Sequence, residues 1–378
     1  MRALAAGLGG PRTGPARILH VLGALDRGGV ETWLMDLAAR LDPARWRFDF
    51  CTLARDPGRY AGRMEALGTR VWRCPRGKGF CGRLHRILRE GGYPVVHSHV
   101  HHYSAVVLAV AQAAGTPVRI AHSHNTADGR RSTLPRRLYR TTAQGLLGRV
   151  ATIRLACSGA AAEGLFGTAP GRLAQIVPYG TPGPAAAALH DLRRALGLGE
   201  EPVVGHVGRF YAQKNHAFLL DVALHLQPLR PQVRFLLAGD GPLRRPIEDR
   251  ARGLGLSGAV VFCGLREDVP ALMASAMDAF LLPSHHEGLP VALLEAQAAG
   301  LPSLVSTAVP PEAAVVAEAV EFLPLAAGPG AWAARLAACL TRGRVPRDRA
   351  AAQLAAAGCT IESSLDRLLS VYREALPA

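Results

Sequence analysis

Residues 284–302 read Ser-His-His-Glu-Gly-Leu-Pro-Val-Ala-Leu-Leu-Glu-Ala-Gln-Ala-Ala-Gly-Leu-Pro, and they give the clearest indication of the fold class. The apolar run 278–283 that precedes it predicts a buried parallel strand. A helix is expected from Val291 to Ala299, because Pro290 suits a first turn and Gly300 a helix end. A strand, a loop and a helix in this order are typical of open α/β sheets, which bind ligands beyond the carboxyl ends of their strands.

Two carboxylates belong to this stretch. Glu287 is expected on the loop beyond the strand, and Glu295 about a turn and a half into the helix. The free amides at the helix start suit a phosphate, and the two oxygens of Glu295 can accept from a pair of hydroxyls. The set therefore fits a sugar joined through a diphosphate to a ribose. The alternative is a strand, a turn and an amphipathic helix that carries two glutamates by chance.

The spacing of Glu287 and Glu295, with seven residues between them, resembles the signature of the family-four (group 1) retaining glycosyltransferases. That resemblance implies the GT-B fold, an α/β architecture of two Rossmann-like domains that face each other across a cleft. It also implies that Glu287 binds hydroxyls of the transferred sugar, that Glu295 binds the ribose, and that the backbone at Gly288 and Leu289 stabilises the diphosphate.

Length and composition agree with two domains that lack a membrane span. A chain of 378 residues is too long for one ordinary core, and its apolar runs are too short to cross a bilayer. Seven cysteines without CxxC spacing indicate neither a zinc site nor a disulfide framework, which fits a reducing cytoplasm. The net charge of +15 is almost entirely arginine. Lys78 and Lys214 are the only lysines. In a chain so rich in arginine, this suggests that the broad, planar guanidinium group of arginine would not suit the role of Lys214.

Strand-like and helix-like segments alternate through both halves of the chain, as in doubly wound sheets. Matching family motifs run from about residue 17 to 375. We expect the following order: a disordered extension over residues 1–16, an acceptor-side domain over 17–180, a linker over 181–190, a nucleotide-sugar-binding domain over 191–358, and over 359–378 a helix that, by the resemblance, crosses back onto the first domain.

A basic loop follows the first predicted strand of the second domain. Arg209 and Lys214, in Gly-Arg-Phe-Tyr-Ala-Gln-Lys-Asn-His, can converge on a diphosphate if the loop folds back. The group 1 enzymes look similar here. Further along, Gly264, Leu265 and Arg266 resemble the segment that cradles the nucleotide base, mainly through its backbone.

Histidines mark the ends of two predicted strands in the first domain. His122 lies in Arg-Ile-Ala-His-Ser-His-Asn, a run similar to one in capsular and exopolysaccharide transferases, where such a histidine approaches the transferred sugar. His124 is the alternative to His122 for this role, because the register of the strand end is uncertain by two residues. We expect His99, His124 and Asn125 to line the acceptor side. Imidazoles can bind a metal, but no carboxylate joins them and the family resemblance implies no metal, so we predict no metal and no cofactor.

Gly28 and Gly29 form a turn that opens the first predicted helix, and their amides can approach a phosphate of the donor closely. The pattern is not GxGxxG, and no suitably placed acidic residue follows a second strand, so the sequence argues against a nicotinamide enzyme. Residues 128–140 hold five arginines, from Arg130 to Arg140, with leucines and a tyrosine between them. They suit an anionic membrane surface, although a solvated helix face fits equally well. A third possibility is that these arginines bind nucleic acid, but the sequence contains no recognised nucleic-acid-binding motif.

The sequence therefore predicts a cytoplasmic glycosyltransferase, associated with the inner face of the plasma membrane. It would move a hexose or N-acetylhexosamine, with UDP favoured over GDP as the carrier, to a polysaccharide or lipid-linked glycan. Front-face chemistry is implied by the resemblance, with His122 orienting the sugar. A nucleotide-sugar epimerase of the same architecture, or an inactive nucleotide-binding homologue, are the alternatives.

Overall fold

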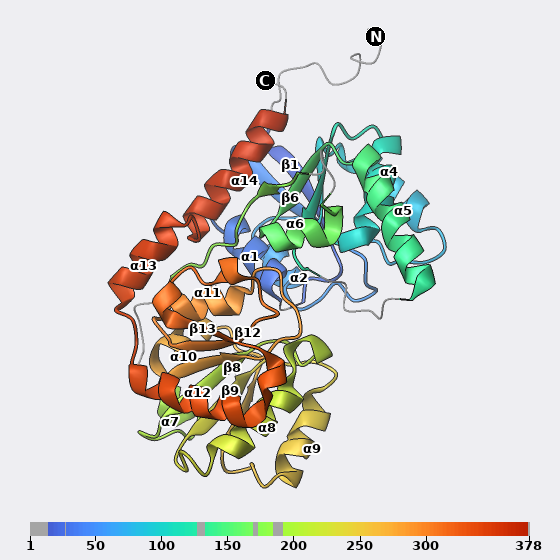
Figure 1. The fold of residues 1–378 in the computed structure, drawn as a ribbon. Coiled ribbons are helices and arrows are strands. Elements are labelled where there is room, and N and C mark those ends of the chain that lie inside the picture. Colours follow the sequence, from blue (N-terminus) through green and yellow to red (C-terminus); the bar gives the residue numbers. More distant parts are fainter. Residues whose placement is uncertain (1–13, 27, 127–132, 169–172, 184–191, 377–378) are drawn as a thin grey trace.

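The computed structural model describes residues 14–26, 28–126, 133–168, 173–183 and 192–376, which form two α/β units (Figure 1). Within these ranges the first unit contains a seven-stranded parallel sheet in the order β3-β2-β1-β4-β5-β6-β7. Its strands are β1 Ala16–Leu22, β2 Trp46–Thr52, β3 Val71–Arg73, β4 Val95–Ser98, β5 Val118–Ser123, β6 Ile153–Ala156 and β7 Gln175–Ile176. Its helices are α1 Gly29–Ala38, α2 Ala61–Ala66, α3 Phe80–Gly91, α4 Ser104–Ala113, α5 Leu134–Val150 and α6 Gly159–Phe166.

The second unit holds a six-stranded parallel sheet among the described residues, in the order β10-β9-β8-β11-β12-β13. Its strands are β8 Val203–Val207, β9 Arg234–Ala238, β10 Val260–Gly264, β11 Ala279–Leu282, β12 Ser303–Ser306 and β13 Val320–Leu323. Its α-helices, with those that end the chain, are α7 Leu192–Ala195, α8 His216–Leu226, α9 Arg244–Gly253, α10 Val269–Ser275, α11 Val291–Ala298, α12 Gly328–Arg342, α13 Arg347–Ala356 and α14 Ile361–Ala375. The predicted α/β fold of two Rossmann-like domains is confirmed.

Short 3₁₀ turns supplement these elements: η1 His101–Tyr103, η2 Ala212–Lys214, η3 Pro311–Ala313, η4 Ala317–Ala319 and η5 Leu325–Ala327. The central strands are apolar because helices cover both faces of each sheet. β4 and β11, for example, are buried along their whole lengths. Buried apolar side chains form one cluster on the outer face of each sheet and a third that runs continuously between the two units.

The chain crosses between the units twice, and the two crossings meet. Thr181 forms a parallel bridge with Thr360, with backbone hydrogen bonds from Thr181 to Cys359 and from Ile361 to Thr181. Thr181 is where the predicted linker begins, and its part from residue 184 onward lies outside the described residues, as do residues 1–13 of the predicted extension. β1 already begins at Ala16.

The last helix, α14, lies against α1 of the first unit, as Figure 1 shows in red. Trp33 on α1 donates a hydrogen bond from Nε1 to the Ser364 hydroxyl at 2.8 Å, and Ser364 donates to the Pro178 carbonyl at 2.8 Å. Tyr372 reaches further in, where its hydroxyl is 2.6 Å from His97 Nδ1. The C-terminal helix is thus fixed to the first sheet by specific polar contacts inside an apolar interface.

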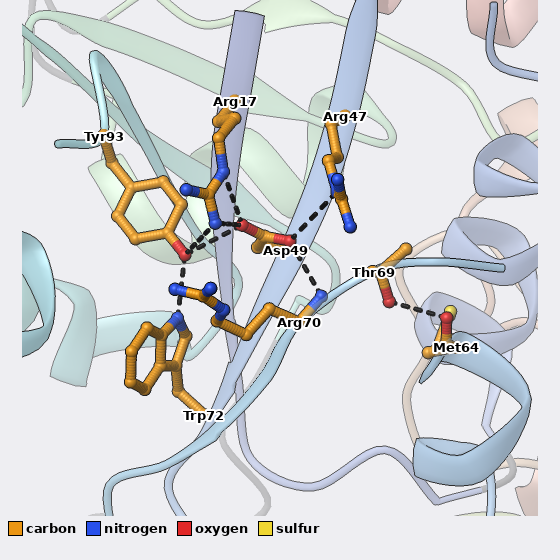
Figure 2. A network of polar contacts seen from close by, with 8 residues as sticks. All are labelled: Arg17, Arg47, Asp49, Met64, Thr69, Arg70, Trp72 and Tyr93. Atoms are coloured by element: carbon orange, nitrogen blue, oxygen red, sulfur yellow. Dashed lines mark hydrogen bonds and ion pairs between the residues drawn. The ribbon is translucent and has the colours of Figure 1, made fainter. Parts of the chain in front are cut away.

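A buried carboxylate on β2 links this strand to its neighbour β1 and to the start of the edge strand β3 (Figure 2). Asp49 on β2 is fully buried and is paired with Arg17 on β1. Its oxygens also accept from the Tyr93 hydroxyl at 2.8 Å and from the Arg70 amide at 2.8 Å. Tyr93 in turn accepts from Trp72 Nε1 on β3 at 2.7 Å. These partners compensate the cost of burying the charge.

Among the described residues, no helix has the length and apolar character needed to cross a membrane.

Candidate active site

A cavity of about 550 Å³ lies between the two units, with lining residues from both. It opens at the carboxyl ends of the strands, where doubly wound sheets bind ligands. Most of the predicted site residues line it: Gly28, Gly29, His99, His124, Asn125, Arg209, Lys214, Leu265, Arg266, Glu287, Leu289 and Glu295. Three predicted residues are not among its lining residues: His122, Gly264 and Gly288.

Lys214 and Glu287 form the central ion pair of the cavity. Lys214 Nζ lies 2.6 Å from Glu287 Oε1, and the two side chains are only 16% and 8% exposed. Lys214 ends the turn η2, and the next residue, Asn215, adopts a left-handed conformation (φ 55°) that starts α8. A Cβ on Gly208 would lie 3.1 Å from the Lys214 side chain, so glycine leaves room for the lysine to fold back over the loop. The loop therefore folds back as the sequence reasoning required.

Gln213 holds the Glu287 loop in place and was missed by the sequence reasoning. Its Nε2 donates to the His286 carbonyl at 2.8 Å and to Glu287 Oε2 at 3.3 Å, while its backbone carbonyl accepts from the His285 amide at 2.8 Å. Both oxygens of Glu287 are thereby engaged. Adjacency to Lys214 was the one available sequence signal.

Arg209 faces the glycine turn of the first unit across the cavity. A Cβ atom placed on Gly28 would lie 3.8 Å from Arg209 Cζ and 2.5 Å from Glu31 Oε2. Gly28 thus lies beside both a guanidinium and a carboxyl group. Burial raises the pKa of Glu31 to about 7, against the opposing effect of Arg209. Glu31 was not predicted as a site residue, although it lies only two residues after Gly29.

The start of α11 lies at the cavity, where Leu289, Pro290 and Val291 line it, and Glu295 lies further along the same helix. Gly288 lies just behind this wall. A Cβ there would collide with the carbonyl oxygen of His124, and the Gly288 carbonyl accepts from the Ser158 hydroxyl at 3.1 Å. Only glycine lets the two units approach so closely at this point.

The predicted base-binding segment follows β10. Leu265 and Arg266 line the cavity, and Arg266 is held by Asp268, with Nε 2.9 Å from Oδ1 and Nη2 2.6 Å from Oδ2. Gly264 itself has φ +70° and turns the chain away from the strand. Its role is therefore to place the next two residues at the cavity.

Five imidazoles gather at the ends of β1, β4 and β5. We call His20, His97, His99, His122 and His124 the histidine cluster. One chain of hydrogen bonds runs from His20 Nδ1 to His99 Nε2 (3.0 Å), from His99 Nδ1 to His124 Nε2 (2.7 Å) and from His124 Nδ1 to the Tyr179 hydroxyl (2.5 Å). A second runs from His122 Nδ1 to His97 Nε2 at 3.0 Å. Tyr179 lines the cavity and was not predicted.

Burial keeps these imidazoles neutral. It lowers the pKa of His20 to about 3 and lowers the pKa of the other four well below the ordinary value, with a further contribution from neighbouring imidazoles. Two overlapping triplets, His20/His97/His99 and His99/His122/His124, each bring ring nitrogens within 4.8 Å of one another. They are the described residues best placed to hold a metal ion, although most of their nitrogens already bond one another.

The structure places His122 differently from the sequence expectation. Its ring is fully buried, where it stacks on His97 at 5.1 Å between centroids and meets the edge of Trp33 at 5.8 Å. His124, the alternative two residues later, reaches the cavity wall instead. The neighbouring His101 and His102 form a separate pair, with Nδ1 atoms 2.7 Å apart.

The two units and the cleft between them have the GT-B architecture. The family described as "Glycosyl transferases group 1" matches residues 190–352, and the "Glycosyl transferase 4-like domain" matches residues 28–180. The protein of Bacillus subtilis (strain 168) named as the glycosyltransferase EpsF is 34% identical over 369 residues, which cover 94% of this chain and 96% of that protein. The chain belongs to the group 1 glycosyltransferases and is a glycosyltransferase enzyme.

Other relatives match over shorter stretches. An Escherichia coli UDP-Gal:alpha-D-GlcNAc-diphosphoundecaprenol alpha-1,3-galactosyltransferase is 37% identical over 103 residues, 26% of either chain. Among solved structures, Anabaena HepE in complex with UDP and glucose superposes with a TM-score of 0.76 at 21% identity, over 95% of this chain and all of that one. Sucrose-phosphate synthase from Thermosynechococcus elongatus gives 0.68 at 20% identity, over 95% and 99%. These likenesses establish the GT-B fold.

Proposed function

We propose that this glycosyltransferase moves a hexose or N-acetylhexosamine from a nucleotide sugar to a cell-surface polysaccharide or a lipid-linked glycan, with retention of the anomeric configuration. The observation that carries the proposal is the cavity between the two units. It brings Arg209, Lys214, Glu287 and Glu295 together at the carboxyl ends of β8 and β11. Two cations and two carboxylates at such an edge match a sugar diphosphate joined to a ribose.

The donor's diphosphate would lie between Arg209, Lys214 and the amides at the start of α11. These groups supply positive charge where negative charge develops on the leaving group. We therefore propose that catalysis needs no metal ion or other cofactor. UDP is favoured over GDP as the carrier, because HepE, which shares the fold, binds UDP. Leu265 and Arg266 would contact the base, and Glu295 the ribose hydroxyls.

Among retaining mechanisms, the contacts of Glu287 favour front-face transfer over a double displacement through a covalent glycosyl-enzyme. One of its oxygens is bound by Lys214 and the other by Gln213, so neither is free to attack the sugar as a nucleophile. In front-face transfer the bond between the sugar and the β-phosphate oxygen breaks as the acceptor oxygen bonds to the same carbon. The acceptor proton passes to the departing phosphate. Glu287 would then hold sugar hydroxyls, and closure of the units would exclude water.

The acceptor would enter from the first unit, past His99, His124 and Asn125, which line that side of the cavity. The Escherichia coli relative acts, by its name, on a diphosphoundecaprenol-linked sugar, which supports a lipid-linked acceptor here. The test is transfer from UDP- and GDP-sugars to such an acceptor with excess chelator, followed by NMR of the new linkage. An inverted product refutes retention, and a requirement for added metal refutes metal-independence.

We also propose that α5 docks the enzyme on the anionic inner face of the plasma membrane. Leu134 and Leu138 are 80% and 65% exposed, and Arg137, Arg140 and Arg149 lie on the same helix. Exposed leucines with arginines around them suit a bilayer interface. Of the predicted basic run, residues 128–132 lie outside the described ranges. Co-sedimentation with anionic vesicles should be lost in the double variant Arg136→Glu/Arg137→Glu, and unchanged binding would refute the docking.

A further inference from the structure

Glu31 is a carboxyl group in the phosphate-binding part of the cavity that the proposed reaction does not yet use. It lies in the first turn of α1 and lines the cavity. Its Oε2 lies over Gly28, since a Cβ at that position would be 2.5 Å from it. The guanidinium of Arg209 approaches the same glycine from the other unit. Glu31 therefore occupies the place where a glycine turn and an arginine would meet a phosphate.

Each proposed phosphate-binding cation already faces a carboxyl group. Lys214 is bonded directly to Glu287 at 2.6 Å. Arg209 acts on Glu31 through its charge, as the largest favourable influence on the ionised form. The two pairs differ in what a donor would do to them. The sugar would satisfy Glu287 through its hydroxyls, but an ionised Glu31 would stand beside the phosphates and repel them.

The charges around Glu31 come from several elements. Burial raises its pKa to about 7; Arg209 after β8 and the Glu31 amide lower it, and Asp26 in the β1–α1 loop raises it. Tyr179 lies on the segment after β7, and the charge of Glu31 contributes to raising the pKa of its hydroxyl. A bound diphosphate would add negative charge and raise the pKa further. A carboxyl that already titrates near neutral pH would then be neutral in the complex.

We propose that Glu31 takes up a proton when the donor's diphosphate binds and donates a hydrogen bond from the resulting carboxylic acid to the β-phosphate. This inference rests on the proposed function. A neutral acid turns a repelling group into a donor, and in the transfer step it would stabilise charge on the departing phosphate. Glu31 keeps its proton during the transfer and shares it with the phosphate through the hydrogen bond. The proton that the departing phosphate takes up comes from the acceptor hydroxyl.

The proposal fixes the pH dependence of nucleotide affinity. Above a free-state pKa of about 7, the free enzyme must bind a proton to bind the diphosphate, so affinity falls as the pH rises. If only the protonated form binds, the Kd for the nucleotide rises roughly 25-fold between about pH 6.5 and about pH 8.5. In Glu31→Gln, whose amide can donate but cannot ionise, this part of the dependence disappears.

The experiment is titration calorimetry of the full-length protein with UDP and with GDP at about pH 8, in buffers of different ionisation enthalpy. For whichever nucleotide binds, wild type should take up close to one proton more than Glu31→Gln. Comparison with the variant removes any contribution from titration of the nucleotide itself. Glu65→Gln, an exposed glutamate on α2, is the matched control and should behave like wild type.

Three results would overturn the inference, and they differ from one another. Equal proton uptake by wild type and Glu31→Gln would show that Glu31 does not change its ionisation. Tighter binding by Glu31→Gln at every pH would show that Glu31 stays ionised and merely competes with the phosphate for Arg209. Absence of UDP and GDP binding in wild type, with a folded protein by thermal melting, would remove the donor site itself and the inference with it.

Discussion

Replacing Lys214 by alanine should remove most of the affinity for the donor's diphosphate. In the present structure its ammonium lies 2.6 Å from Glu287 Oε1, and the side chain is 16% exposed. A Coulomb energy of roughly 6 kcal/mol follows for such a pair at an effective dielectric constant of about 20. Desolvation of the two charges cancels much of it, and a charge-assisted hydrogen bond retains about 1.5–3 kcal/mol net.

A phosphate oxygen at the same ammonium should gain a similar free energy. Its loss predicts a Kd for UDP that is roughly 10- to 150-fold higher in Lys214→Ala. Titration calorimetry measures this directly. Lys78→Ala is the matched control, because Lys78 is the other lysine of the chain and is exposed on the loop after β3.

The same substitution should also lower the free energy of unfolding, because Glu287 is left buried without its cation. The double variant Lys214→Ala/Glu287→Gln should recover most of that loss, since it removes both charges together. Unchanged UDP affinity in Lys214→Ala, with normal binding in wild type, would refute the assignment of Lys214 to the diphosphate.

Four further results are expected. His122→Ala should leave UDP affinity unchanged and lower turnover, since the ring lies behind the cavity wall. Gly288→Ala should lower the free energy of unfolding by about 1–3 kcal/mol and reduce activity, because its methyl group would collide with the neighbouring unit. Asp49→Asn should cost about 3 kcal/mol, which lowers the melting temperature by roughly 6–12 °C. Burial lowers the pKa of His206 to about 4, so stability should fall as the pH drops from about 6.5 towards that value.

Each of these has its own check. For His122, weakened UDP binding would place the ring in the donor site instead of behind it. Gly62→Ala on α2, where a methyl group would meet nothing within 4 Å, is the control for Gly288. For Asp49, a melting temperature within error of wild type would show that the network of Figure 2 adds nothing. For His206, a melting temperature that stays flat as the pH falls would contradict a neutral buried imidazole.

The interior strands could be predicted from sequence because burial on both faces makes them apolar runs. β8, β9 and β11 are examples, and their ends set the positions of Arg209 and Glu287. β3 and β13 could not be predicted in this way. Each lies at an edge of its sheet and only three or four residues long, with partly exposed side chains that carry little periodic signal.

The donor half of the site was predictable because its residues follow strand ends within one domain. The glycine-free span from Arg209 to Lys214 then needs only one turn, η2, to bring both cations to the cavity. Contacts that join distant segments could not be predicted in this way. Tyr179 reaches His124 from beyond β7, and Gln213 bonds the loop of Glu287.

The register of the histidines shows a similar limit. His122 and His124 are two residues apart, so they point to the same face of the chain, and periodicity cannot distinguish them. Contacts from other segments separate them. His122 stacks on His97, which bonds Tyr372 on α14, whereas His124 bonds Tyr179 at the cavity wall. The five-imidazole cluster exists only because three strands align their ends.

The most direct test of a nucleotide-sugar site in this cleft is hydrogen exchange of the wild-type protein with and without saturating UDP or GDP. Bound nucleotide should slow exchange in the segments 208–216 and 284–295, which carry Lys214 and Glu287, and at the glycine turn 28–31. Bound nucleotide that leaves these segments unchanged and protects other parts of the chain would contradict this placement of the site.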